Sequence, residues 1–136
     1  MILVDTNVIS ETTRRAPSPE VLSFLSRHPV VALSSVSVME LEAGVSGAPV
    51  AKRVRLAAWL EELLSSGAVQ IVVMDVAVAR VAGRLRAVTR HRTVPTEDLL
   101  IGATAIAKSM TLATRNTKHF ESLGVPVINP FVATPP

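Results

Sequence analysis

The sequence contains no cysteine and very few aromatic residues. The absence of cysteine excludes disulfides, thiolate metal sites and cysteine nucleophiles. Aromatic residues make up only 3% of the 136 residues, and none of them is tyrosine. A protein surface that binds nucleic-acid bases by stacking needs several rings, so we do not expect one here.

Long hydrophobic runs are absent as well. No run approaches the roughly 18 apolar residues that span a bilayer, and the apolar start Met1–Val4 has no basic residues before it and ends at Asp5. This pattern is unlike a secretory signal, so we expect a cytoplasmic protein that does not enter membranes. The formal net charge of +3 is weakly basic and permits a nucleic-acid partner without requiring one.

The mean hydropathy of +0.42 is high for a domain of this size. A chain of 136 residues forms one domain with one limited interior. We therefore interpret the hydrophobic excess as part of an interface between copies of the chain.

Short β-branched runs alternate with longer amphipathic segments along the chain. Three features mark helix starts: Ser18, an expected capping box of Ser37 with Glu40, and Thr96. The patterns predict strands at 2–4, 30–33, 71–73, 111–113 and 127–128, and helices at 18–28, 37 to 44–47, 50–65, 75–91, 97–109 and 117–122. This alternation predicts a single α/β domain over 1–136, with a mostly parallel central sheet, helices on both faces and a loose tail at 130–136.

Four polar residues follow predicted strands or begin predicted helices. Asp5 ends the first strand, Glu40 and Asp98 lie in first helical turns, and Asn116 follows the strand at 111–113. In a parallel sheet these positions meet at the carboxyl edge of the strands, where ligands bind. Local explanations also exist for each: a turn, a capping box, the helix dipole and an N-cap. Asp5 is the least easily explained locally, because an acid that directly follows a buried strand needs a partner.

The three carboxylates would give this edge a definite chemistry if they converge. Close carboxylates repel one another and stay ionised at neutral pH only when a cation compensates them. A set of oxygen donors without histidine or cysteine suits Mg²⁺ or Mn²⁺. Such ions hold phosphate oxygens and activate water, which predicts hydrolysis of a phosphodiester.

Four segments together resemble a known family. In chain order they are residues 2–7 (ILVDTN), 37–44 (SVMELEAG), 98–105 (DLLIGATA) and 112–120 (LATRNTKHF). In this order and spacing they resemble the PIN-domain ribonucleases, and among these the VapC-type toxins of toxin–antitoxin pairs. The resemblance covers nearly the whole chain and implies a PIN-like fold and a Mg²⁺- or Mn²⁺-dependent endoribonuclease.

The resemblance also implies roles for particular residues. Asp5, Glu40 and Asp98 match the metal-binding acids of the family, and Asn116 takes a fourth catalytic position that is often aspartate. His119 stands where a further acid is frequent, so the number of metal ions is open, and His119 as a proton donor is one hypothesis.

Neighbouring residues are expected to support these groups. Thr6 and Asn7 are predicted to orient Asp5 through hydrogen bonds, and Thr114 to do the same near Asn116. Three arginines are predicted to flank the pocket and contact RNA: Arg14, Arg15 and Arg115.

The resemblance implies two protein partners. One is a small antitoxin, which would lie across the apolar helices at 37–46 and 50–65 and place a basic side chain among the acids. The other is a second copy of the chain in a homodimer, in agreement with the hydrophobic excess.

Two other functions remain open from the sequence. The uncharged Asn116 and His119 suit a non-catalytic PIN-like module that binds RNA or protein. An enzyme with Asp5 as a covalent nucleophile is the least favoured, because that chemistry needs an acid at position 7, which is Asn7.

Overall fold

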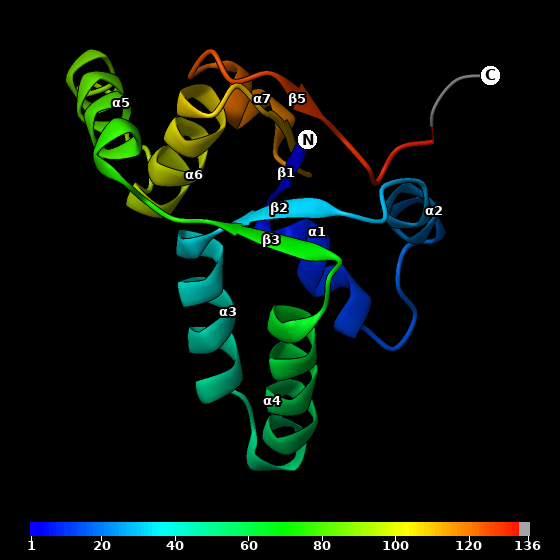
Figure 1. Ribbon diagram of the computed structural model, residues 1–136. Coiled ribbons are helices and arrows are strands. Elements are labelled where there is room, and N and C mark those ends of the chain that lie inside the picture. The colour runs from blue at the N-terminus through cyan, green and yellow to red at the C-terminus, as the bar shows by residue number, and fades with distance from the viewer. Residues whose placement is uncertain (134–136) are drawn as a thin grey trace.

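The computed structural model describes residues 1–133, which form one five-stranded sheet covered by helices (Figure 1). The strand order is β3-β2-β1-β4-β5, and each neighbouring pair is parallel. The strands are β1 (Ile2–Val4), β2 (Val31–Ser34), β3 (Val69–Val72), β4 (Thr111–Ala113) and β5 (Val127–Ile128). The predicted α/β class with a parallel sheet is confirmed.

The helices lie between these strands in the chain, as parallel crossovers require. They are α1 (Thr6–Ser10), the 3₁₀ turn η1 (Glu11–Thr13), α2 (Pro19–Arg27), α3 (Ser35–Ser46), α4 (Val50–Ser65), α5 (Val76–Val88), α6 (Thr96–Ala107) and α7 (Thr117–Glu121). The short segments α1 and η1 were not predicted from the sequence.

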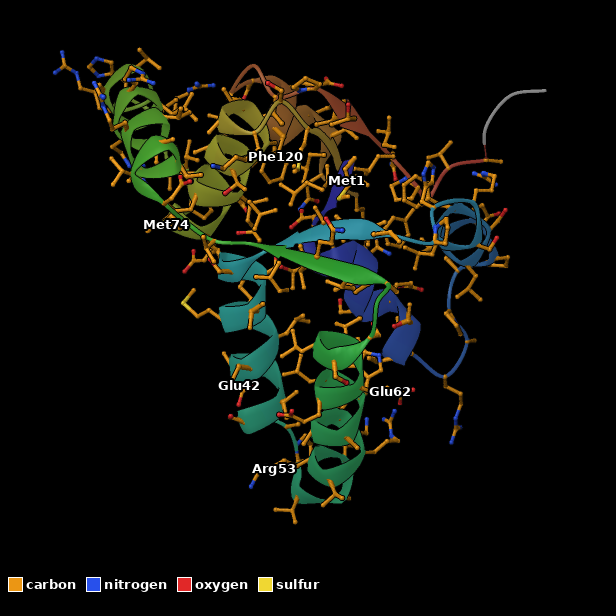
Figure 2. The ribbon with its side chains drawn as sticks, viewed as in Figure 1. Met1, Glu42, Arg53, Glu62, Met74 and Phe120 are labelled. Carbon is orange, nitrogen blue, oxygen red and sulfur yellow. The ribbon has the colours of Figure 1, made fainter. Side chains whose placement is uncertain are left out.

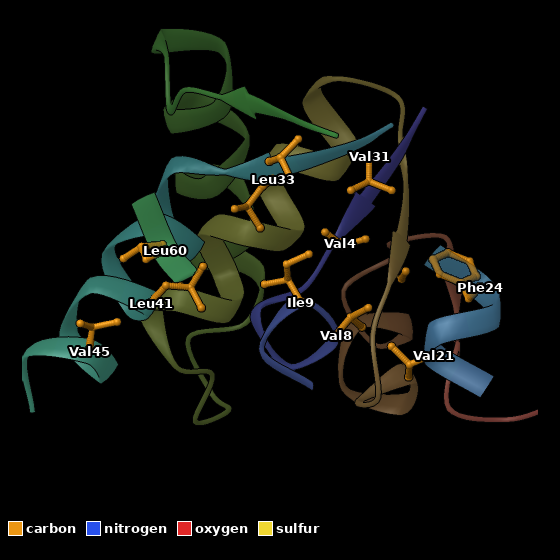
Figure 3. Packing of buried hydrophobic residues seen from close by; sticks show 12 residues of the cluster. Val4, Val8, Ile9, Val21, Phe24, Val31, Leu33, Leu41, Val45 and Leu60 are labelled. Atoms are coloured by element: carbon orange, nitrogen blue, oxygen red, sulfur yellow. The ribbon is translucent and has the colours of Figure 1, made fainter. Parts of the chain in front are cut away.

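Strand β1 lies at the centre of the sheet and contributes side chains to the hydrophobic clusters on both of its faces. Successive side chains of a strand point to opposite faces, so Val4 and Leu3 enter different clusters. Val4 packs with residues of α1, α2, α3 and α4, and Leu3 packs with residues of α6 and α7. Figure 3 shows the first cluster, in which Val8, Phe24 and Leu60 lie beneath the sheet. Helices on both faces, as predicted, therefore bury the sheet.

Helix α5 packs on α6 through Val78, Ala82 and Ala103. On another side of α6, a Cβ atom added at Gly102 would lie 3.2 Å from Cγ2 of Val125 and close to Phe120. The small residues of α6 thus permit close packing on both of these sides.

Several predicted boundaries are wrong by a few residues. The expected capping box is not formed, because α3 begins earlier and Ser34 caps it by accepting a hydrogen bond from the Val36 amide at 3.0 Å. Helix α6 begins at Thr96 itself, after Pro95, so the threonine side chain does not cap it. Strand β3 starts two residues before its predicted position, and α5 ends at Val88, before the predicted end at about 91.

The sequence predicted a loose tail over 130–136, and the first two residues of this segment are packed instead. Pro130 is buried, and Phe131 packs against the cluster around Val4. The rest of that segment, 134–136, lies outside the described residues. In the described part of the chain, none of the helices combines the length and hydrophobicity needed to cross a bilayer.

Candidate acidic active site

Asp5 is a buried carboxylate at the carboxyl end of β1. It caps α1, and its Oδ1 accepts a hydrogen bond from the Thr6 amide at 2.8 Å. Its Oδ2 accepts hydrogen bonds from the Thr114 hydroxyl at 2.7 Å and from Asn7 Nδ2 at 3.2 Å. The side chain is thus fixed from β4 as well as from α1. The hydrogen bonds expected of Thr6 and Asn7 are present.

Glu40 approaches Asp5 from α3 and is linked to it by one residue. The Thr6 hydroxyl donates a hydrogen bond to Oε1 of Glu40 at 2.6 Å and lies 3.0 Å from the Ser37 hydroxyl. Thr6 therefore holds Asp5 through its amide and Glu40 through its side chain. In Figure 2 the neighbouring acid Glu42 lies on α3 well below the sheet, and its side chain is exposed.

Asp98 lies in the first turn of α6 and faces α7. Its Oδ2 is 3.2 Å from Nε2 of His119, and its side chain is about one quarter exposed. Burial raises the pKa of Asp98; the charge of His119 opposes this shift, and the charges of Glu40 and Glu97 add to it.

The pKa of Asp5 is also raised. Burial is the main cause, and it outweighs the hydrogen bonds from Thr114, Thr6 and Asn7, which lower the pKa. The charge of Asp98 raises it further. Asp5 therefore interacts electrostatically with Asp98, and Asp98 with Glu40. The three predicted acids therefore lie near one another: Thr6 bonds to both Asp5 and Glu40, and Asp98 is close enough to each to affect its charge or be affected by it.

These carboxylates have little positive charge to compensate them. Among residues 1–133, the ion pairs of the site are limited to the contact between Asp98 and His119. In the same part of the chain, no three His, Asp or Glu side chains are close enough to hold a metal ion as they stand. Repulsion between uncompensated carboxylates opposes their closer approach. Their all-oxygen donor set and excess negative charge fit a hard divalent cation.

Asn116 stands at the start of α7, after β4. Its amide donates a hydrogen bond to the Thr114 hydroxyl at 3.0 Å, but its side chain makes no capping hydrogen bond. Thr114 is buried, and its hydroxyl connects the Asn116 backbone to Asp5 through two hydrogen bonds. A cavity of about 470 Å³ lies here, with Asn116, Asp98 and His119 among its lining residues.

The three arginines predicted to contact RNA differ in their surroundings. Arg115 lines the same cavity, together with Lys118. Arg14 and Arg115 both form ion pairs with the buried Glu11, at 3.4 and 3.6 Å, whereas Arg15 is exposed on the segment after η1. The sequence analysis missed Glu11, because its partner Arg115 comes from a distant part of the chain.

The arginines of α5 and its exit provide a partial basic surface only. Arg86 donates hydrogen bonds to the Val94 carbonyl oxygen and the Thr96 hydroxyl, and Arg92 donates one to the Ser122 carbonyl oxygen. These two arginines therefore hold neighbouring loops, while Arg80 and others on α5 are exposed.

Comparison of the sequence with known protein families gives a match that agrees with the parallel sheet and the acidic residues at its edge. The sequence profile of the PIN domain matches residues 2–125. The chain belongs to the PIN domain family, which confirms the resemblance found in the sequence.

Individual members of the PIN domain family are similar to this chain over nearly its whole length. The chain is 40% identical to the plasmid stability protein StbB of Pseudomonas syringae pv. tomato, over 98% of this chain and 100% of that protein. It is 34% identical to the VapC ribonuclease Y4jK of Sinorhizobium fredii, over 96% of this chain and 98% of that protein. The crystal structure of FitAcB from Neisseria gonorrhoeae superposes with a TM-score of 0.81 at 35% identity, covering 96% of this chain and 99% of the other.

Proposed function

We propose that this protein is a Mg²⁺- or Mn²⁺-dependent endoribonuclease and the toxin of a toxin–antitoxin pair. The observation that carries the proposal is the gathering of acids at one edge of the sheet: Thr6 bonds to both Asp5 and Glu40, and Asp98 lines the cavity beside them. The similarity to a VapC ribonuclease supports RNA as the substrate.

The residues suited to hold the cation are Asp5, Asp98 and Glu40, with Asn116 as a neutral neighbour. When bound, the cation would lower the pKa of a coordinated water and stabilise charge on the leaving oxygen of a phosphodiester. Thr6 and Thr114 hold the carboxylates in place through hydrogen bonds.

The basic side chains beside the acids complete the site. Arg115 and Lys118 line the cavity next to Asp98, where they can bind the phosphate groups that flank the cleaved bond. The basic side chains that would bind RNA thus lie directly beside the acidic side chains that would bind the metal ion.

The proposal is tested by incubating the purified protein with total RNA, Mg²⁺ or Mn²⁺, with and without EDTA, and mapping the cut ends. We expect cleavage that EDTA abolishes. Asp5→Asn and Asp98→Asn should each lower the cleavage rate by at least about a hundredfold, because each removes a charged metal donor. Circular dichroism should show that both variants fold.

Glu97→Gln is the matched control for Asp98→Asn, because it changes the neighbouring carboxylate in the same turn of α6. Its cleavage rate should stay within a fewfold of the unmodified protein. Undiminished cleavage in both Asp5→Asn and Asp98→Asn, or full cleavage in EDTA, would contradict the proposal.

An antitoxin partner and a homodimer follow from the same proposal. The antitoxin would cover the exposed apolar side chains of α3 and α4, such as Met39, Val50 and Val54, and insert a basic residue among the acids. If a small open reading frame lies directly upstream of this gene, its co-expression should restore growth that the protein alone arrests.

The ion pair of Asp98 with His119 favours a second candidate, a non-catalytic PIN-like module that binds RNA or protein. In this case the His119 side chain, and not a metal ion, occupies the position beside Oδ2 of Asp98. Titration that detects RNA binding but no Mn²⁺ binding would support this second candidate and oppose the first.

A further inference from the structure

Glu11 is a buried carboxylate shared by three segments of the chain. Its side chain is 6% exposed. Oε2 accepts a hydrogen bond from the Ser18 amide at 2.8 Å, and Oε1 forms ion pairs with Arg14 and Arg115. A buried carboxylate is costly unless it is paired, so this arrangement depends on the arginines as much as they depend on it.

Arg115 is held in place from three directions. Its amide donates a hydrogen bond to Asn7 Oδ1 at 3.3 Å, its guanidinium carbon lies 3.9 Å from the centre of the Phe131 ring, and its Nη2 faces Glu11. Stacking on an aromatic ring and pairing with a carboxylate both restrict a long, flexible side chain.

Within residues 1–133, the Arg115 guanidinium nevertheless keeps donors free. Its side chain is half exposed and lines the cavity beside Asp98. A guanidinium has five N–H donors, and Glu11 faces only part of them. The remaining donors are available to an anion in the cavity.

We propose that Glu11 is a positioning residue: by holding Arg115 against Phe131, it presents the free guanidinium donors to a phosphate group of bound RNA beside Asp98. This inference rests on the proposed function, because the acidic site defines where the RNA lies. It assigns Glu11 a role in substrate binding that acts through Arg115 and needs no contact with the reacting atoms.

The sign of the effect separates positioning from simple electrostatics. Glu11→Gln makes the protein less negative next to a phosphate site, so electrostatics alone predicts tighter RNA binding. Positioning predicts weaker binding, because a freed arginine must be ordered again when RNA binds. The cost of ordering one long side chain corresponds to about a three- to tenfold loss of affinity.

The test measures fluorescence anisotropy of a labelled single-stranded RNA of mixed sequence in EDTA, so that metal-dependent cleavage does not contribute. Glu11→Gln should weaken binding about three- to tenfold, and Arg115→Ala about tenfold or more. Loss of one phosphate contact should also reduce the slope of log affinity against log salt by about 0.7 in Arg115→Ala, with a smaller reduction in Glu11→Gln.

A double variant distinguishes positioning from a structural role. Glutamine at position 11 still offers an oxygen to the Ser18 amide, so the loop keeps its hydrogen bond. In the Arg115→Ala background, Glu11→Gln should have no further effect on RNA affinity. An equal loss in both backgrounds would show a structural role and overturn the inference.

Glu61→Gln is the charge-matched control, because Glu61 is exposed on α4 and its removal also adds one positive unit to the net charge. It should leave RNA affinity nearly unchanged. Equal or tighter binding by Glu11→Gln, or no binding by the unmodified protein, overturns the inference. The cleavage assay decides the proposed function separately, because binding in EDTA does not depend on catalysis.

Discussion

Neutral hydroxyl groups hold the acids of the site. The Thr6 hydroxyl bonds to Glu40, and the Thr114 hydroxyl bonds to Asp5. These donors fix the carboxylates without supplying positive charge. The proposed cation would therefore not have to displace a lysine or arginine from these two carboxylates.

Thr114→Val is expected to destabilise the fold by about 1–3 kcal/mol at pH 7, because buried Asp5 loses a hydrogen-bond donor. The pKa of Asp5, which this hydrogen bond lowers, should rise further. Urea unfolding and an NMR titration of Asp5 measure the two effects.

The control for this variant is Thr104→Val in α6. Thr104 is also buried, but its hydroxyl only adds a hydrogen bond to the Leu100 carbonyl oxygen within the helix. Its loss should cost less than about 1 kcal/mol. Equal losses at Thr114 and Thr104 would argue against a special role for the bond to Asp5.

Asp98→Asn is expected to raise the stability of the metal-free protein at pH 7. The folded state raises the pKa of Asp98 above its ordinary value of 3.8, so folding disfavours the ionised carboxylate at neutral pH. The gain should shrink as the pH falls through the raised pKa and vanish below about 3.8, where both states bind the proton.

Thermal unfolding between pH 3 and 7 measures this gain. Glu42→Gln, which changes an exposed acid of α3, should give no comparable gain. A constant difference between Asp98→Asn and the unmodified protein over the whole pH range would contradict the argument.

At the scale of elements, the helices with a clear local start signal were predicted best. Helix α2 was predicted to within one residue, because Ser18 and Pro19 form a local start signal and the apolar residues repeat with helical spacing. Helix α1 has five residues and η1 has three, which is too short for a hydrophobic period to show. Ser37 looked like a cap, but Ser34, three residues earlier, caps α3 by accepting a hydrogen bond from the Val36 amide.

The candidate site was predictable because topology alone places strand ends together. The sequence predicted Asp5 at the end of a strand and Asp98 in a first helical turn, as the structure has them. The predicted first-turn position of Glu40 is wrong, because α3 begins at Ser35 and Glu40 is its sixth residue. The sequence did not reveal the Glu11 network, since the ion pair of Glu11 with Arg115 depends on how α1, η1 and the segment after β4 are folded. Pairings of this kind leave no local pattern in a single sequence.

Asp75 connects the start of α5 to the end of α6. Its Oδ1 accepts a hydrogen bond from the Val78 amide at 3.0 Å, and its Oδ2 pairs with Lys108 at 2.6 Å. The hydrogen bond from Lys108 is the main cause that lowers the pKa of Asp75. The stabilisation is therefore present above pH 3.8 and lost as the pH falls through the lowered pKa.

Three variants separate the two contacts of Asp75. Asp75→Asn keeps a capping oxygen and loses the ion pair, Lys108→Met also loses the ion pair, and Asp75→Ala loses both contacts. Amide hydrogen exchange of α5 at pH 7 should therefore be fastest in Asp75→Ala and intermediate in the other two. Equal exchange in all three variants would show that the cap is unimportant.

At the scale of the whole molecule, the hydrophobic excess is visible as exposed apolar side chains. Val54 of α4 is 80% exposed and Val76 of α5 is 75% exposed. Val73 and Met74, between β3 and α5, are also exposed. These exposed apolar side chains are the candidates for an interface between two copies of the chain.

We expect sedimentation velocity to give a mass of twice the 14.5 kDa of one chain. Val73→Glu should dissociate the dimer if the region of β3 and α5 forms the interface, and Val54→Glu should do so if α4 forms it. The variant that leaves the mass unchanged serves as the control for the other. A monomer at all concentrations would contradict the expected homodimer.

The hydrogen bond from Thr114 to Asp5 joins residues that are 109 positions apart. During synthesis, Asp5 therefore leaves the ribosome long before the residue that fixes its carboxylate exists. A nascent chain that still lacks β4 and α7 cannot have the complete site. Under the proposed function, RNA cleavage therefore becomes possible only when nearly the entire polypeptide has been made.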